Sequence, residues 1–548
     1  MNHRPDLSNQ TKKHERLVIV GSTLGTLFEW YDFFLYGAVA SVFSKQFFAP
    51  LSPSSAYLFA LIAFGVGFAV RPLGALLFGR LGDLVGRKYT FLMTIILMGG
   101  ATFCVGLLPT YAQAGIWAPI LLLALRVLQG LGLGGEYGGA AIYVAEHASP
   151  GKKGRNTSWI QMTGAGGTIL ALAVVFACRS YFGDEFEEWA WRIPFLLSAL
   201  MLAVSIYIRT VLHESPVYER MKAEGKTSKR PIKETFGSWA NVKAMLIALF
   251  GLVMGVTTVL YTGQTYSFFF MMETLRLDIG TASFLNVTSL VLVLPMMWIA
   301  AAVSDKIGRK KVILTGCLLA SLTLFPIFRG ITHYANPGLE AATQNHPVTV
   351  YAAASTCSFQ IDLLGKNPPT TECDKIKAML AKSGVPYTNV ESAAERPTVT
   401  IGTTSIVGFD GAAMHGALER AGYAHRADPA QVNRPMVILL LVVLCAYFAM
   451  VYAPLAAALV EMFPARVRYT ALSFPYHVGN GIFGGFFPAM AFAMVTATGD
   501  IYFGLWYPVV FAALTFVIGA LFLREQPEQE VPDVPVPVTQ IESRGYPN

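Results

Sequence analysis

The stretch Gly79-Arg80-Leu81-Gly82-Asp83-Leu84-Val85-Gly86-Arg87-Lys88 lies between two long apolar segments and decides how the chain is built. Its second half recurs as Asp305-Lys306-Ile307-Gly308-Arg309-Lys310, again between apolar segments and 222 residues further along. A charged loop repeated in so hydrophobic a chain indicates an internally duplicated membrane protein. Secondary transporters are built in this way and place the substrate site between the two repeats.

The composition agrees with a membrane protein. Of the 548 residues, 54% are hydrophobic and 14% are charged, and the mean hydropathy is +0.50. Soluble domains carry about a quarter charged residues, so the bilayer is the expected environment. We interpret the net charge of +7 as a signal for orientation in the membrane. No basic, aromatic-rich helix lies outside the apolar segments, so we expect no nucleic-acid partner.

Twelve apolar segments are long enough to cross a bilayer core of about 30 Å. They predict an all-α membrane protein with twelve transmembrane helices in two six-helix bundles. The segments lie near 17–43, 56–79, 89–109, 117–146, 157–180, 190–211, 243–272, 281–303, 311–329, 435–460, 470–497 and 502–523. The expected domains are a tail (1–16), a first bundle (17–211), a linker (212–242), a second bundle (243–523) and a second tail (524–548).

Basic residues in the short loops fall mainly on one side of the predicted membrane path. Because such loops stay in the cytoplasm, both termini and the linker are predicted to be cytoplasmic. The bases on this side include Arg4, Lys12, Lys13, Arg16, Arg80, Arg87, Lys88, Lys152, Lys153, Arg155, Lys306, Arg309, Lys310, Lys311, Arg466 and Arg468.

A second repeat shows that the two halves differ in length. Glu146 ends the fourth segment and Arg155 follows it, whereas Glu461 ends the tenth and Arg468 follows it. Glu461 comes 315 residues after Glu146, which is 93 more than the offset of the first repeat. We place the excess in a polar insertion at 330–434, on the outer side of the membrane.

The insertion carries its own structural signals. Residues 397–401 alternate as in a strand, and residues 412–422 have a helical pattern. The insertion is either an ordered cap or a loosely folded loop. Cys357 and Cys373 lie in it and could form a disulfide if this side is oxidising.

Three carboxylates lie inside apolar segments. Glu29 and Asp32 are three residues apart in the first segment and share a helix face, and Glu136 lies in the fourth. A carboxylate in hydrocarbon is costly unless it faces a cavity, has a partner or takes up a proton. We expect Glu29 or Asp32, with preference for Asp32, to handle the proton or the substrate. A static ion pair or a position at the cavity rim remains the alternative.

Arg71 and Arg126 lie in the second and fourth segments. A guanidinium group presents a planar set of donors that matches a carboxylate. Each arginine could therefore hold a substrate carboxylate or neutralise one of the buried acids. The sequence leaves both interpretations open.

Gly130, Gly134 and Gly138 recur every four residues in the fourth segment. This spacing lets another helix approach closely. The neighbouring run 131–135 resembles a nucleotide-binding loop, but no strand precedes it, so we expect no nucleotide.

Polar side chains also occur in the middle of later segments. Tyr261 and Gln264 lie in the seventh, and His477 and Asn480 lie in the eleventh. They are candidates for lining the cavity, although helix–helix hydrogen bonding is at least as common a use. His477 is more often a structural group in such a place than a proton carrier.

The two repeated loops place charges at helix ends, where they can latch the halves together on the cytoplasmic side or simply fix the topology. The residues assigned to this gate are Gly79, Asp83, Gly86, Arg87, Lys88, Asp305, Gly308 and Arg309.

The loop at 79–88 resembles the signature loop of the major facilitator superfamily, and residues 126–130 resemble its arginine-containing helix motif. Further segments are similar to the metabolite:proton symporter family. The resemblance covers 17–329 and 435–523. The segments that narrow it are 25–33, 71–74, 134–137, 191–195, 214–216 and 461–468.

The resemblance implies that Asp83, Gly86 and Arg87 belong to the gate, that the first-segment carboxylates line the cavity, and that Arg71 is a candidate ligand for a substrate carboxylate. Members of this family carry α-ketoglutarate, citrate, shikimate, proline or betaine into bacteria, which implies the inner membrane. Leu84 replaces the basic residue expected after Asp83, and Ala301 replaces the first glycine of the second loop. Both departures weaken the gate argument.

We therefore expect a monomeric, proton-coupled symporter that carries a small organic acid or zwitterion by alternating access. Its partners are the substrate, protons and the lipid bilayer, and we expect no cofactor, no metal and no enzymatic activity. A proton-driven exporter on the same fold and a nutrient sensor on a transporter scaffold remain the alternatives. The substrate cannot be named from composition.

Overall fold

The computed structural model describes residues 7–50, 53–211, 213–353, 356–357, 370–394 and 396–525. Among these residues, ten helices are long and apolar enough to cross a membrane. Two more segments complete the set: α1 (Leu7–Ala38), and α3 (Pro53–Ala69), which continues after one residue into α4 (Arg71–Leu84). The fold is the predicted bundle of twelve membrane-spanning helices.

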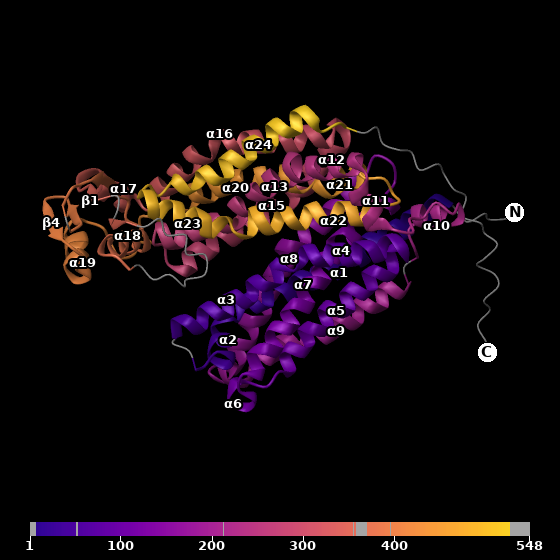
Figure 1. Ribbon diagram of the computed structural model, residues 1–548, viewed down its shortest axis with the longest axis horizontal. Helices are drawn as coiled ribbons and strands as arrows, with labels where there is room; N and C mark the ends of the chain where they lie inside the picture. Colours follow the sequence, from indigo (N-terminus) through magenta and orange to yellow (C-terminus); the bar gives the residue numbers. More distant parts are fainter. Residues whose placement is uncertain are drawn as a thin grey trace.

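The first bundle contains the six spans of the N-terminal half, drawn from indigo to magenta in Figure 1. Helix α1 begins ten residues before the apolar sequence, inside the tail that was expected to run from 1 to 16. Short helices α2 (Ala40–Phe47) and α6 (Tyr111–Ala114) lie in its loops. The remaining spans are α5 (Arg87–Leu107), α7 (Trp117–His147), α8 (Lys153–Phe182) and α9 (Arg192–Val211).

The second bundle contains two spans that are interrupted by π-helical turns. The first runs through α12 (Trp239–Ala248), η2 (Leu249–Val253), α13 (Met254–Tyr261), η3 (Thr262–Tyr266), α14 (Ser267–Phe269) and η4 (Phe270–Thr274). The other runs through α22 (Arg468–Gly479), η6 (Asn480–Gly485) and α23 (Phe487–Thr498). The remaining spans are α15 (Ile279–Ile307), α16 (Arg309–Ala335), α20 (Arg434–Tyr452) with α21 (Leu455–Met462), and α24 (Trp506–Phe522).

The linker is more structured than its polar sequence indicates. It contains α10 (Pro216–Ala223) and α11 (Pro231–Gly237), and the next span begins at Trp239 rather than at 243. Phe236 packs edge-on against Phe474 of α22, with 5.4 Å between the ring centroids, and Glu234 pairs with Arg466 at 2.8 Å. The linker therefore contacts the second bundle as well as joining the halves.

The insertion is an ordered α/β domain, the first of the two alternatives. The all-α expectation holds for the bundles, and the insertion adds a four-stranded mixed sheet in the order β2-β1-β3-β4. The expected strand and helix fall at β3 and α19. Its elements are α17 (Pro337–Asn345), β1 (Val348–Ala352), α18 (Glu372–Lys382), β2 (Thr388–Glu391), β3 (Thr398–Ile401), β4 (Thr404–Val407) and α19 (Gly411–Arg420).

Alternation along the strands builds the core of the insertion. Val348 and Val350 of β1 pair with Ile401 and Val399 of β3, and all four side chains are buried. Residues between them point to the other face of the sheet, because successive side chains in a strand alternate. The one-sided core indicates that the helices cover a single face of the sheet.

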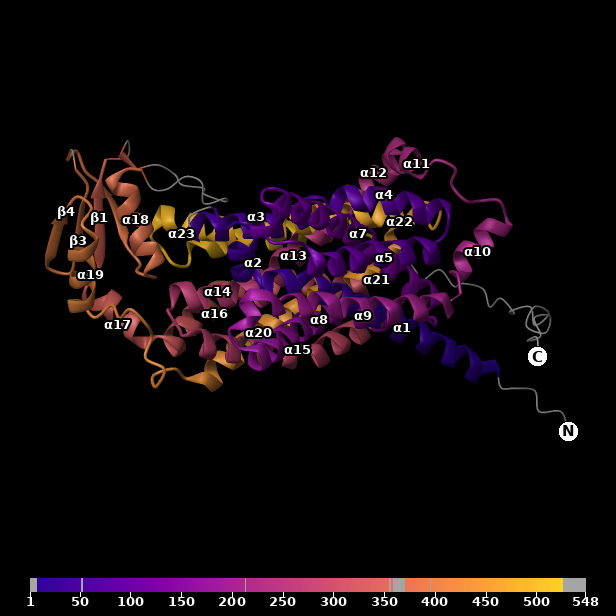
Figure 2. The ribbon, with the colours of Figure 1, turned by 90° about the horizontal axis from the view of Figure 1, so that it is seen from below.

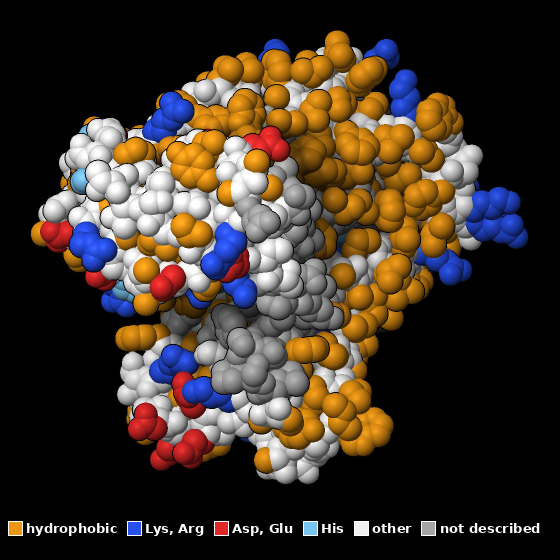
Figure 3. Space-filling model, turned by 60° about the vertical axis from the view of Figure 1, so that its left-hand side comes forward, with side chains coloured by type: hydrophobic (Ala, Val, Ile, Leu, Met, Phe, Trp, Pro, Cys, Tyr) orange, Lys and Arg blue, Asp and Glu red, His pale blue; other side chains and the backbone are white. Residues whose placement is uncertain are grey.

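The two bundles meet at the end that carries Asp83 and Asp305, called here the motif end, and diverge towards the end that carries the insertion (Figure 1). The linker helices α10 and α11 lie at the motif end, opposite the insertion (Figure 2). Figure 3 shows a broad hydrophobic surface along the flank of the molecule, with charged side chains mainly around its edges. This surface fits contact with lipid tails.

Candidate functional site

At the motif end, Asp83 joins the first bundle to the second. Its buried carboxylate accepts hydrogen bonds from the backbone N–H groups of Tyr469 (3.2 Å) and Thr470 (3.0 Å) and from the Thr470 hydroxyl (2.9 Å). These residues begin α22, whose first N–H groups have no partner within the helix. Asp83 therefore caps a helix of the other bundle.

Asp305 makes the reciprocal contact. Its carboxylate accepts from the backbone N–H groups of Gly154 (2.8 Å) and Arg155 (2.9 Å), at the start of α8 in the first bundle. Arg309 donates to the same carboxylate at 3.1 Å. The two copies of the loop thus cap one helix each, and each capped helix lies in the opposite bundle.

Glu146 adds an ion pair across the same boundary. It accepts from Arg468 of the second bundle at 2.7 Å and from the hydroxyl of Ser215. Arg87 donates to the backbone carbonyl of Ala465, again in the second bundle, at 2.6 Å. We call the contacts of Asp83, Asp305, Glu146 and Arg87 the motif-end latch.

The glycines of the repeated loops serve backbone shape. Gly86 and Gly308 precede α5 and α16 with φ of 127° and 104°, in the region that favours glycine. A side chain at Gly86 would collide with Glu214, which accepts from the backbone N–H of Arg87 at 3.0 Å. Burial raises the pKa of Glu214, whereas the hydrogen bonds that it accepts from backbone N–H groups lower this pKa.

The fourth-segment glycines divide into two groups. A Cβ at Gly130 or Gly134 would strike the backbone of the second span, at Gly67 and Arg71 respectively, so these residues pack helices within the first bundle. A Cβ at Gly138 would strike the side chain of Ser473 in the second bundle. Gly79 meets α22 in the same way, with Thr470 Cα 2.8 Å from a Cβ placed there.

Arg71 lies in the middle of the molecule, where the bundles face each other. Its guanidinium carbon lies 4.4 Å from the centroid of the Phe33 ring and 3.9 Å from that of the Phe68 ring. These two rings pack edge-on against each other, with 4.8 Å between their centroids. Its Nε and Nη2 atoms are buried without a hydrogen-bond partner. The hydroxyls of Tyr261 and Tyr476 in the second bundle are near enough to interact with it electrostatically. A guanidinium group that lies beside aromatic rings and has unpartnered N–H donors is suited to bind a carboxylate.

Tyrosines from both bundles pack together close to Arg71. Tyr137 of α7 stacks on Tyr476 of α22, with 3.5 Å between centroids and 4° between planes. The hydroxyls of Tyr452 and Tyr476 are 3.3 Å apart, and Gln161 donates to Tyr137 at 3.2 Å. The sequence analysis did not single out Gln161 or Tyr452. The signal it used for Tyr261, a polar side chain within an apolar segment, would have found both.

The other predicted cavity residues occupy three positions. His477 is buried near Tyr137, and its ring lies close to the backbone of Gly134. Asn480 donates to the backbone carbonyl of Tyr476 at 3.0 Å, so in this structure its side-chain amide bonds to its own helix. Gln264 is half-buried in the π-helical turn η3.

Arg126 is satisfied inside the first bundle. It donates to Gln129 at 2.8 Å, and Gln129 donates to Thr102 at 2.7 Å. Thr102 lies within hydrogen-bonding reach of Asp32. This chain links Arg126 to Asp32 through neutral groups, which favours neutralisation of a buried acid over substrate binding for Arg126.

Glu29 and Glu136 come together in the middle of the first bundle, within hydrogen-bonding reach of each other. Arg209, from the last turn of α9, lies 3.4 Å from Glu136 and is equally buried. The sequence analysis missed Arg209, because an arginine at the end of a predicted span normally extends to the membrane surface.

Comparison with known proteins supports the fold and identifies the class of protein. Residues 17–359 match the family described as "Sugar (and other) transporter". A metabolite transport protein of Haemophilus influenzae is 32% identical over 514 residues, covering 93% of this chain and 96% of that protein. The shikimate transporter of Escherichia coli is 36% identical over 334 residues, covering 60% and 75%. The alpha-ketoglutarate permease of E. coli is 33% identical over 332 residues, covering 60% and 75%.

Solved structures show the same architecture. The proton:xylose symporter XylE bound to 6-bromo-6-deoxy-D-glucose superposes with a TM-score of 0.60 at 15% identity, covering 94% of this chain and 97% of that one. The protein is therefore a multi-pass membrane transporter of small metabolites and not an enzyme. It belongs to the sugar (and other) transporter family of the major facilitator superfamily.

Proposed function

We propose that this protein is a proton-coupled symporter of the bacterial inner membrane that imports a small organic acid or zwitterion by alternating access. The observation that carries the proposal is Arg71, whose two unpartnered N–H-bearing atoms are buried between the bundles. Buried N–H donors without a hydrogen-bond partner are costly, so the position favours the arrival of an acceptor such as a carboxylate.

The surroundings of Arg71 support a small carboxylate. Phe33 and Phe68 both contact the guanidinium, and its unpartnered Nε and Nη2 atoms are left for a two-point contact with a carboxylate. The hydroxyls of Tyr261, Tyr452 and Tyr476 interact electrostatically with Arg71, and we expect them to donate to a hydroxyl or second acceptor of the same molecule. Relatives that are shikimate and alpha-ketoglutarate carriers agree with this chemistry.

The state of the molecule supports alternating access. The motif-end latch is closed, and the bundles diverge at the insertion end (Figure 1). If basic loops are cytoplasmic, the motif end and both termini face the cytoplasm, and this state faces outward. Import then requires the latch to open while the insertion end closes.

Uptake into proteoliposomes tests the proposal. Labelled shikimate, α-ketoglutarate, citrate, proline and betaine would be offered with and without an inward proton gradient to wild type, Arg71→Lys and Arg179→Lys. We expect gradient-driven accumulation of one compound by wild type and by Arg179→Lys, whose arginine is exposed, and its loss in Arg71→Lys. Gradient-driven efflux instead would identify an exporter, and binding without flux would identify a sensor.

A further inference from the structure

A small cavity in the first bundle touches all three buried carboxylates. It measures about 20 Å³ and is lined by Glu29, Asp32 and Glu136 together with residues of α5 and α9. A space of this size accommodates one water molecule. A single water bridging carboxylates is a means of delivering a proton to them.

Arg209 holds one side of this group. Its guanidinium lies 3.4 Å from Glu136 and stacks on the ring of Phe91, and both the arginine and the glutamate are buried. Gly25 of α1 provides the room, because a Cβ there would strike the guanidinium. Arg209 therefore stabilises the ionised form of Glu136.

Glu29 lies between two competing partners. It is within hydrogen-bonding reach of Glu136 and close enough to Arg71 for electrostatic attraction. Two carboxylates in contact cannot both remain ionised cheaply, so the pair takes up one proton readily. With Glu136 held ionised by Arg209, the proton belongs on Glu29.

Charge balance shows what this proton does. Among the described residues, three acids and three bases are buried in the middle of the first bundle, so their charges cancel when all six are ionised. One proton on Glu29 leaves a single positive charge, at the unpartnered Arg71. The six are Glu29, Asp32, Glu136, Arg71, Arg126 and Arg209.

We propose that Glu29 carries the coupled proton, that Arg209 is the positioning residue for it, and that protonation of Glu29 frees Arg71 to bind the carboxylate of a singly charged anion. This rests on the proposed symport. Ionised Glu29 neutralises Arg71 in the empty carrier, and a proton and a monocarboxylate replace that interaction together. Transport is then electroneutral, with one proton for one anionic charge.

The groups that face Glu29 come from several elements. Glu136 (α7), Arg209 (α9), Arg71 (α4) and Asp32 of its own helix interact with it or share its cavity. From the second bundle, the Tyr452 hydroxyl interacts with Glu29. Helix α5 contributes apolar side chains to the cavity.

The proton site is tested without any substrate by infrared difference spectroscopy of the purified full chain during a pH titration. We expect the band of one protonated buried carboxyl group, lost in Glu29→Gln and kept in Asp32→Asn, the matched change one helical turn away. In Arg209→Gln the midpoint pH of this band should shift, and Arg209→Lys should restore it. A band lost in Asp32→Asn but kept in Glu29→Gln overturns the proposal, as does a midpoint unmoved in Arg209→Gln.

Coupling is tested by transport of labelled shikimate, a monocarboxylate. Glu29→Gln should keep exchange of internal for external shikimate while its gradient-driven accumulation falls to the level without a gradient, and wild-type uptake should not respond to membrane potential. Accumulation by Glu29→Gln equal to wild type overturns the inference and leaves symport standing. Absence of gradient-driven uptake in wild type counts against the proposed function, while the infrared result still decides the proton site.

Discussion

Arg71, Arg126 and Arg209 are all buried in one bundle, yet their neighbours give them different roles. Arg126 donates to Gln129 and the backbone, and Arg209 pairs with Glu136. Arg71 contacts two aromatic rings, and its Nε and Nη2 atoms are buried without a hydrogen-bond partner. Arg126 and Arg209 already donate to side-chain acceptors, so we expect the substrate to bind at Arg71.

Replacing Arg71 by Ala should weaken substrate binding without unfolding the protein. A hydrogen bond to a charged group contributes about 1.5–3 kcal/mol, which corresponds to roughly 10- to 150-fold in Kd. Equilibrium binding of the accumulated substrate measures this loss, with Arg179→Ala as the control. An unchanged Kd would show that the carboxylate binds elsewhere.

At the scale of helices, the same glycine pattern serves two purposes. Gly134 lets α7 contact α4 within the first bundle, whereas Gly138 lets α7 contact α22 of the second. In the proposed alternating-access cycle the first contact persists, whereas the second breaks each time the motif end opens. Substitutions at Gly134 and Gly138 should therefore affect different properties of the protein.

Gly134→Ala should destabilise the fold, because its Cβ would strike the backbone of α4, and overpacking of this kind costs about 1–3 kcal/mol. Gly138→Ala should leave the melting temperature nearly unchanged but raise hydrogen–deuterium exchange at the start of α22. Gly100→Ala is the control, since open space surrounds a Cβ there. Equal loss of melting temperature at 134 and 138 would contradict the distinction.

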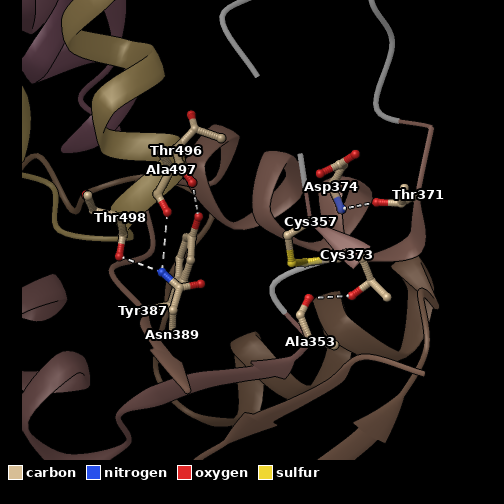
Figure 4. The surroundings of a disulfide bond; sticks show 11 residues. Ala353, Cys357, Thr371, Cys373, Asp374, Tyr387, Asn389, Thr496, Ala497 and Thr498 are labelled. Carbon is tan, nitrogen blue, oxygen red and sulfur yellow. Dashed lines mark hydrogen bonds between the residues drawn. A yellow bond between two sulfur atoms is a disulfide. The ribbon is translucent and has the colours of Figure 1, made fainter. Parts of the chain in front are cut away.

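The insertion is fastened to the outer tips of the two interrupted spans. Tyr387 donates its hydroxyl to Thr496, and Asn389 donates to Thr498 at 2.8 Å, beside the Cys357–Cys373 disulfide (Figure 4). On the other side, the backbone carbonyl of Arg276 accepts from Ala427 at 3.0 Å. The insertion thus links the loop after η4 to the loop after α23.

Combining Tyr387→Phe with Asn389→Ala should loosen this attachment, since each neutral hydrogen bond contributes about 1 kcal/mol. Limited proteolysis should then cut the insertion faster, and exchange at 496–499 should rise. Thr388→Ala, an exposed position between them, should change neither rate. If the double variant behaves like wild type, other contacts dominate the attachment.

At the scale of the whole molecule, the duplication produces a reciprocal latch. Asp83 and Asp305 each cap a helix of the opposite bundle, so the motif end closes at two related places at once. While the motif end is closed, the hydrogen bonds from the two aspartates satisfy N–H groups that are buried at the interface between the bundles. When the motif end opens, these N–H groups are exposed to water, which can replace the aspartates as acceptors. The latch can therefore close firmly and still open.

Cysteines at 138 and 473 should lock this state. A Cβ at Gly138 would lie 3.2 Å from the Cβ of Ser473, close to the separation in a disulfide. Oxidation of the Gly138→Cys, Ser473→Cys pair should abolish uptake, and reduction should restore it. The two single variants are the controls, and full uptake by the cross-linked pair would contradict alternating access at this end.

The sequence by itself determined the duplication, the twelve spans, the position of the insertion and the candidate Arg71. These features follow from the lengths of the apolar segments and from the presence of charged residues inside them, where an unpaired charge is costly. Both properties can be read from the local sequence. The tertiary structure decided which arginine is unpaired, that Asp83 and Asp305 act across the bundles, and that Arg209 reaches Glu136. It also decided that the insertion is an α/β domain. These features depend on contacts between side chains that are distant in the sequence. Such contacts are determined by the packing of the bundles and not by the local sequence.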